Sequence, residues 1–167
     1  MKNVILIGMP AVGKTTVGRC IASQLYMEFL DTDDVIREKC MTTLPDLIEK
    51  HGHENFKKIE ERIILDCAQL GVVIATGGSA VYGQKAMQHL KQNGIVLYLK
   101  ISYNEIVKRL KRAKGRGVVI KEGQTLLDLY KERVVLYEKY ADILVEVDGI
   151  TMEETVKKCL EKLKKMW

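Results

Sequence analysis

The sequence is poor in proline and lacks paired cysteines. Only two of its 167 residues are proline, and no Cys-x-x-Cys spacing occurs among its four cysteines, which are Cys20, Cys40, Cys67 and Cys159. Scattered thiols are typical of reduced cysteines in a cytoplasmic protein, rather than of a disulfide framework or a zinc site. A cytoplasmic location is therefore predicted.

Long apolar runs are also missing. No segment approaches the ~20 apolar residues that a membrane helix needs. The N-terminal stretch MKNVILIGMP has one lysine before an apolar run, as a signal peptide would, but the run is short and leads directly into a glycine loop. A buried first strand is the better interpretation, and no membrane partner is expected.

The chain shows no internal repeat, no low-complexity segment and no linker, so residues 1–167 are predicted to form one domain, acting as a monomer. The net charge of +5 raises the alternative of nucleic-acid binding. However, the lysines are spread along predicted helices, and the densest run, residues 157–165, fits the solvated face of an amphipathic helix. No nucleic-acid partner is expected.

Short apolar segments alternate with segments of helical spacing. The predicted strands are NVILIG, FLDTD, VVIATGG, IVLYLKI and ILVEVDG. The predicted helices are 15–25, 34–40, 44–51, 54–68, 84–92, 103–111, 126–140 and 152–164. This alternation indicates an α/β fold of three layers, with a parallel sheet between helices and with ligands at the carboxyl ends of the strands.

A phosphate-binding loop follows the first predicted strand and opens the first helix. The segment GMPAVGKT, residues 8–15, matches the pattern GxxxxGK[ST] in the context that the motif requires. Lys14 is expected to reach the β- and γ-phosphates of ATP, and the Thr15 hydroxyl to bind Mg²⁺. Backbone and side-chain contacts to ATP are predicted for Gly8, Ala11, Val12, Gly13, Lys14, Thr15 and Thr16.

The loop alone fits GTPases, ATP-driven motors and small-molecule kinases. The strand VVIATGG ends in Thr76 and glycines, so it lacks the aspartate of the usual Walker-B form, and no NKxD-type sequence reads a guanine. The short chain also leaves little room for motor machinery. A small-molecule kinase remains.

Two carboxylates follow the second predicted strand. Asp31 and Asp33 are two residues apart, which on a strand directs both side chains to one face. Beside a phosphate loop, one of the two would support Mg²⁺ through its water shell, and the other would meet the acceptor hydroxyl as a base. Helix capping is the alternative role, and Asp34 is the predicted N-cap. Further on, the spacing of Lys57 with Glu60 and Glu61 predicts a solvated salt-bridge face.

In order and spacing, the segments GMPAVGKTT, LDTD, FKKIEE, ATGGSAV and ERVVLYEKYAD resemble the shikimate kinases over nearly the whole chain. The resemblance implies a nucleoside-monophosphate-kinase-like fold with a five-stranded parallel sheet. It also implies transfer of the ATP γ-phosphate to a hydroxyl of shikimate, on the pathway to chorismate and the aromatic amino acids.

The resemblance also assigns residues by position. An acceptor-binding helical region falls at about residues 32–62 and a mobile lid at about residues 112–124. Arg109 would pack on the adenine, and Arg116, in the lid, would approach the transferring phosphate as a catalytic residue with Lys14 and Asp33. The acceptor would contact Asp33, Lys57, Gly77, Gly78, Ser79 and Arg133, and Asp31 would support Mg²⁺ through water.

The chain departs from the family pattern mainly around the acceptor and the lid. Lys57 occupies a position where the family has arginine, and Ser79 one where it has a third glycine. Gly117 and Val135 occupy positions where it has proline. A lysine offers a point charge where an arginine offers a bidentate fork. Shikimate is the leading acceptor. The alternatives are another polyol or sugar acid, and a nucleotide-binding paralogue with weak activity or none.

Overall fold

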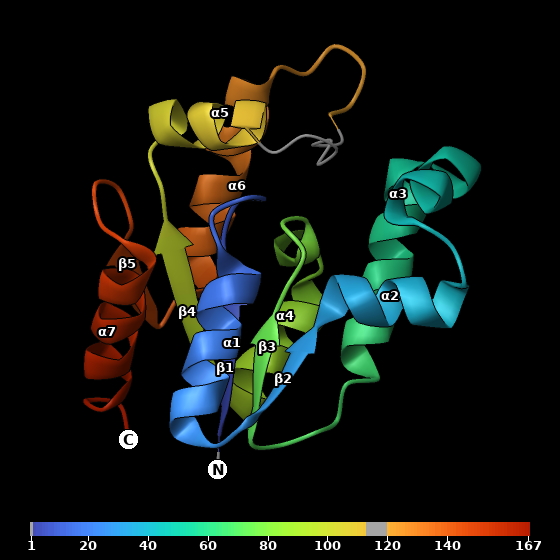
Figure 1. The fold of residues 1–167 in the computed structure, drawn as a ribbon. Coiled ribbons are helices and arrows are strands. Elements are labelled where there is room, and N and C mark those ends of the chain that lie inside the picture. Colours follow the sequence, from blue (N-terminus) through green and yellow to red (C-terminus); the bar gives the residue numbers. More distant parts are fainter. Residues whose placement is uncertain (1, 113–119) are drawn as a thin grey trace.

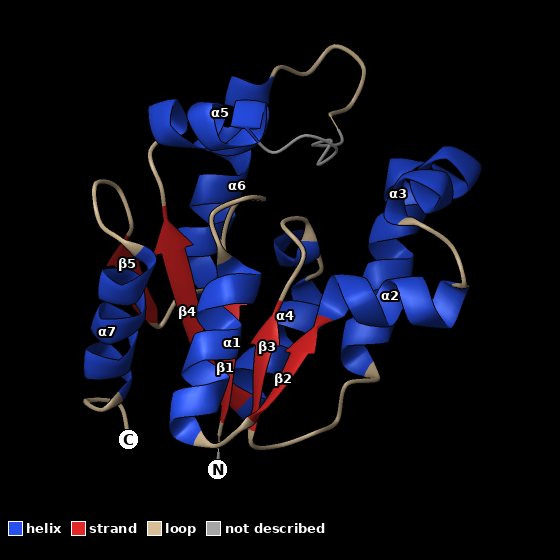
Figure 2. Cartoon of the chain, in the orientation of Figure 1, coloured by secondary structure: helices blue, strands red, loops and turns tan. Residues whose placement is uncertain are grey.

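The computed structural model describes residues 2–112 and 120–167. Five parallel strands form one sheet in the order β2-β3-β1-β4-β5 (Figures 1 and 2). The strands are β1 (Asn3–Ile7), β2 (Glu28–Asp31), β3 (Val72–Ala75), β4 (Gly94–Lys100) and β5 (Ile143–Glu146). The predicted parallel sheet of five strands is thereby confirmed.

Helices cover both faces of the sheet. In Figure 1, α1 (Lys14–Leu25) and α7 (Met152–Leu163) lie in front of it, and α4 (Gln84–Asn93) and α6 (Leu126–Tyr140) lie behind it. Above the carboxyl ends of the strands lies α5 (Tyr103–Arg112), while the two termini lie at the opposite end. The phosphate loop, which follows β1, therefore opens toward the end of the sheet where ligands of such folds bind.

The core is built on the central strand. All five residues of β1 are buried, and β1 pairs with both β3 and β4. A strand that is covered on both faces has no solvent side, which is why NVILI reads as a continuous apolar run and not as an alternating one. Each fully buried Val, Ile or Leu side chain contributes about 1.5–3 kcal/mol relative to exposure.

A pair of helices extends from the edge of the sheet next to β2 (Figure 1). It consists of α2 (Thr32–Cys40) and α3 (Leu44–Leu65), and a small core of its own joins them through Ile36, Leu47, Phe56 and Ile63. The helix α3 is interrupted at Gly52, whose φ of 77° is left-handed. The kink lies between the two helices that were predicted from the sequence, 44–51 and 54–68.

The start of α2 corrects two predictions. Asp31, not Asp34, is the N-cap, because its carboxylate accepts a hydrogen bond of 3.0 Å from the Asp33 amide. The strand also ends at Asp31, so Asp33 belongs to the first helical turn. Their spacing had suggested that the two carboxylates share one strand face, and this prediction is wrong.

Among the described residues, no helix combines the length and the apolar character that crossing a membrane would require. The predicted lid, residues 112–124, includes residues 113–119, which lie outside the described part of the chain.

Candidate active site

The phosphate loop turns sharply between β1 and α1. Gly8 and Gly13 have φ angles of 146° and 105°, which favour glycine, and a Cβ atom on Gly8 would lie 2.8 Å from the Leu99 carbonyl oxygen. The helix α1 begins at Lys14, so its free amide groups and positive dipole end face the loop. The buried Lys14 amine donates to the carbonyl oxygens of Gly8 and Met9, at 2.6 and 2.8 Å.

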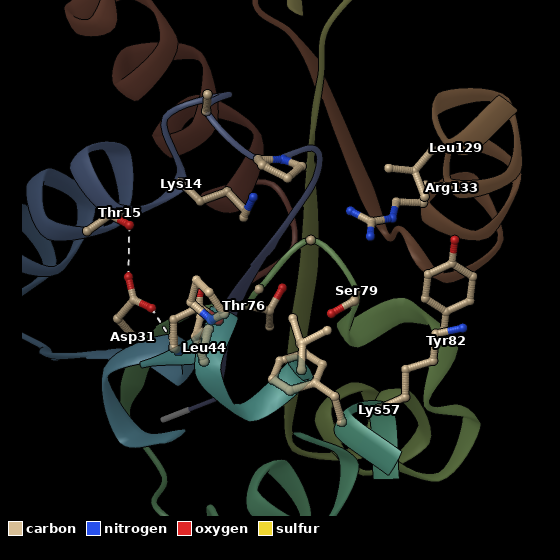
Figure 3. Close-up of a pocket in the computed structure, with 18 of the residues that line it drawn as sticks. Lys14, Thr15, Asp31, Leu44, Lys57, Thr76, Ser79, Tyr82, Leu129 and Arg133 are labelled. Atoms are coloured by element: carbon tan, nitrogen blue, oxygen red, sulfur yellow. Dashed lines mark hydrogen bonds between the residues drawn. The ribbon is translucent and has the colours of Figure 1, made fainter. Parts of the chain in front are cut away.

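Thr15 and Asp31 meet beside the loop. The Thr15 hydroxyl donates to Asp31 Oδ2 at 2.8 Å, while Asp31 Oδ1 accepts from the Asp33 amide (Figure 3). The carboxylate that caps α2 is thus also the one that orients the Thr15 hydroxyl. The sequence predicted both residues near a metal, and the structure places their oxygens side by side.

Two further carboxylates approach the backbone at Gly77. A Cβ atom at this position would lie 2.6 Å from Asp33 Oδ1 and 2.8 Å from Glu60 Oε1, so any larger residue would have to displace these carboxylates. Burial, followed by the nearby charge of Asp31, raises the pKa of Asp33. Burial raises the pKa of Glu60 to about 7. Two carboxyl groups in one poorly solvated place disfavour each other's ionised forms.

The prediction that Glu60 lies with Lys57 on a solvated salt-bridge face is wrong. Only 2% of Glu60 is exposed, and its Oε2 atom accepts a hydrogen bond of 2.6 Å from the Ser79 hydroxyl. The Lys57 amine lies instead 3.3 Å from Glu54 Oε1. Glu60 Oε1 has no hydrogen-bond partner among the described residues, which is uncommon for a buried oxygen.

The helix α6 contributes two residues to the glycine turn. Arg133 is 7% exposed, and its Nη1 atom lies 2.8 Å from where a Cβ atom of Gly78 would stand. Its Nε atom is buried without a hydrogen-bond partner in the described part of the chain. One helical turn later, the buried Tyr137 hydroxyl donates to the Gly78 carbonyl oxygen at 2.7 Å. The turn and the arginine are therefore positioned by the same helix.

A cavity of about 790 Å³ joins these elements. Figure 3 shows Lys14, Thr15 and Asp31 on one side of it, with Lys57, Ser79, Tyr82 and Arg133 on the other. The predicted site residues that line it are Ala11, Gly13, Lys14, Thr15, Thr16, Asp31, Asp33, Lys57, Gly77, Gly78, Ser79 and Arg133. Residues predicted to bind ATP and residues predicted to bind the acceptor thus line the same cavity.

Three predicted ATP residues lie outside this lining. Gly8 forms the base of the loop, and the Val12 side chain is buried. Arg109, from α5, donates a hydrogen bond of 3.0 Å to the Val12 carbonyl oxygen and lies 3.6 Å from Glu105. It therefore braces the phosphate loop from outside the cavity. Arg116 falls outside the described residues.

Sequence reasoning missed three residues of the site. Glu60 looked like part of a solvated face, and neither Tyr82 nor Tyr137 was singled out. The available signal for Tyr137 was its spacing, because a residue four positions after Arg133 lies on the same helix face. For Tyr82 the sequence offered only its closeness to the glycine turn.

The family model described as shikimate kinase matches residues 10–164. The chain belongs to the shikimate kinase family. It is 35% identical to a shikimate kinase of Thermodesulfovibrio yellowstonii, over 99% of this chain and 97% of that one. A shikimate kinase of Pseudomonas aeruginosa is 36% identical, over 99% and 98% of the two chains.

Solved structures agree with this membership. A shikimate kinase from Acinetobacter baumannii, in complex with shikimate, superposes with a TM-score of 0.90 at 34% identity, covering 99% of this chain and 94% of that one. The family places this chain among the ATP-dependent phosphotransferases with a hydroxyl group as acceptor.

Proposed function

We propose that this chain transfers the γ-phosphate of ATP to a hydroxyl of shikimate. The observation that carries the proposal is that one cavity is lined both by the phosphate loop and by Asp33, Gly78 and Arg133. Such an arrangement holds donor and acceptor side by side in one cavity, and phosphoryl transfer depends mainly on positioning and charge stabilisation.

The acceptor side suits a small hydroxylated acid. The Lys57 amine and the Arg133 guanidinium, whose Nε atom has no hydrogen-bond partner among the described residues, supply positive charge for a carboxylate. Asp33 lies across the glycine turn, where it would accept hydrogen bonds from ring hydroxyls and orient, or deprotonate, the reacting one. The amide groups of the turn would complete the contacts. These roles are proposed from charge and position.

The phosphate side suits ATP with Mg²⁺. The loop amides and the Lys14 amine would neutralise the phosphate oxygens, while the Thr15 hydroxyl would bind the metal and Asp31 would act through its water shell. When bound, Mg²⁺ supplies positive charge to the transferring phosphate. The described residues contain no cluster of three or more His, Cys, Asp or Glu side chains suited to a metal. Kinase sites generally bind Mg²⁺ with few protein ligands.

The acceptor-binding role of residues 32–62 and the lid role of residues 112–124 belong to the same proposal, as do the monomeric state and the cytoplasmic location. The small core between α2 and α3 supports the first of these, because it lets the helix pair hold its shape beside the cavity. Light scattering during size-exclusion chromatography tests the monomer.

A coupled assay of ADP release tests the function. We expect turnover with shikimate and little turnover with quinate or gluconate. Lys14→Ala should abolish the rate while the circular dichroism spectrum stays unchanged, because the charge on the transferring phosphate loses its main protein partner. A robust rate on another polyol acid, with none on shikimate, would replace the proposed acceptor. No rate on any acid would favour a nucleotide-binding paralogue.

A further inference from the structure

The ring of Tyr82 contacts two cations at the acceptor end of the cavity. The Lys57 amine lies 4.1 Å from the ring centroid, and the Arg133 guanidinium carbon lies 5.6 Å from it. Both distances fall within the range in which an aromatic face attracts a positive charge. Figure 3 shows Tyr82 between the Lys57 amine and Arg133 at the edge of the cavity.

The three side chains come from three elements. Tyr82 ends the short 3₁₀ helix η1 (Ala80–Tyr82), Lys57 comes from α3 and Arg133 from α6. All three line the cavity. The ring is thus a contact shared by residues of α3 and α6.

A ring holds a cation differently from a carboxylate. It attracts the positive charge without neutralising it, so the cation keeps its capacity for an incoming anion. The competing carboxylate, Glu54, is 71% exposed and is shared with Lys121, which approaches it at 3.0 Å. Exposed pairs of this kind are weak. Of the contacts that Lys57 makes with Glu54 and with the ring, the contact with the ring is therefore the less solvated.

We propose that Tyr82 is a positioning residue for the acceptor carboxylate. It holds Lys57 and Arg133 together so that the two cations receive the carboxylate jointly. A lysine amine at the end of a flexible stem lacks the preorganised fork of an arginine, and an aromatic platform restores part of that order. The inference rests on the proposed function, since the carboxylate is that of shikimate.

The test measures the dissociation constant of shikimate by calorimetry, without ATP. Tyr82→Leu removes the ring and should raise the constant about threefold to tenfold, whereas Tyr82→Phe keeps the ring and should raise it less than about twofold. Lys57→Met should also weaken shikimate binding. In the Lys57→Met background, Tyr82→Leu should raise the dissociation constant by a smaller factor than in the wild type, because one of the two cations that the ring contacts is gone.

The matched control is Lys58→Met, which removes an exposed lysine next to Lys57. It should leave shikimate binding unchanged. Thermal unfolding of every variant shows whether it folds, and kcat at saturating shikimate should stay within about twofold in Tyr82→Leu, since the ring acts on the carboxylate end and not on the transferring phosphate.

Three outcomes would overturn the inference. They are an unchanged dissociation constant in folded Tyr82→Leu, equal losses in the Phe and Leu variants, and full additivity of Tyr82→Leu with Lys57→Met. Wild-type protein that binds no shikimate would overturn this inference and the proposed function together. Binding without phosphate transfer would remove the proposed function alone, and the binding series would still decide the role of Tyr82.

Discussion

Ser79 and Glu60 share a hydrogen bond of 2.6 Å beneath the glycine turn, with the serine hydroxyl as donor and Glu60 Oε2 as acceptor. Serine fits here because its backbone, at φ −90°, does not require glycine. This bond lowers the pKa of Glu60, while the larger effect of burial raises it. A residue that departs from the family pattern thus supports a buried carboxyl at the acceptor site.

Ser79→Ala should therefore destabilise the protein most at alkaline pH. The ionised Glu60 loses a donor that stabilises it, at a cost of about 1–2 kcal/mol above pH 7 and less at pH 5. Urea unfolding at both pH values measures this. Ser23→Ala, at an exposed position of α1, is the control and should be neutral or slightly stabilising at both. Equal losses at the two pH values would contradict the prediction.

Glu60→Gln should flatten the dependence of stability on pH. Between the ordinary pKa of 4.5 and the folded value of about 7, the folded protein holds a proton on Glu60 that the unfolded chain has released. Wild-type stability therefore falls as pH rises through this window, by on the order of 1–3 kcal/mol. The variant lacks this slope and keeps the one from Asp33, whose pKa is also raised. Parallel curves for the two proteins, from urea unfolding between pH 4.5 and 8, would refute the assignment.

Lys57→Arg should lower the KM for shikimate. A planar guanidinium can donate two parallel hydrogen bonds to a carboxylate, where the amine offers a point charge, and the gain should be on the order of 1 kcal/mol, or about fivefold in KM. Steady-state kinetics on shikimate and on other polyol acids give the measurement. If lysine stands here because the true acceptor differs, the variant will instead lose activity on that acceptor.

Tyr137→Phe should affect both stability and acceptor binding. It removes the only hydroxyl donor recorded for the Gly78 carbonyl oxygen among the described residues, so the fold should lose about 1–2 kcal/mol and the KM for shikimate should rise. Tyr130→Phe is a matched control, because Tyr130 is also in α6 and donates a similar bond, of 2.6 Å, to the Ile101 carbonyl oxygen away from the cavity. It should cost stability without changing KM. A rise in KM in both variants would point to a general loosening of α6.

The sequence by itself determined the features that depend on neighbouring residues. The phosphate loop is one contiguous segment whose glycines and lysine act together, so its pattern and its position between strand and helix were enough to identify it. Helix periodicity also placed α6 at Leu126–Tyr140, the range predicted, because one face of that helix packs on the sheet. The alternation of strands and helices was enough for the parallel sheet.

Only the tertiary structure decided which charges pair. Three glutamates lie three or four residues from Lys57: Glu54, Glu60 and Glu61. Helical spacing would allow Lys57 to form an ion pair with any of them. Packing of α3 against the glycine turn buries Glu60 beneath Ser79 and leaves Glu54 exposed, so Lys57 pairs with Glu54 and with the ring of Tyr82. Periodicity reports which face of a helix is buried, but the partner of each buried group is set by residues distant in the chain, whose positions only the packed fold fixes.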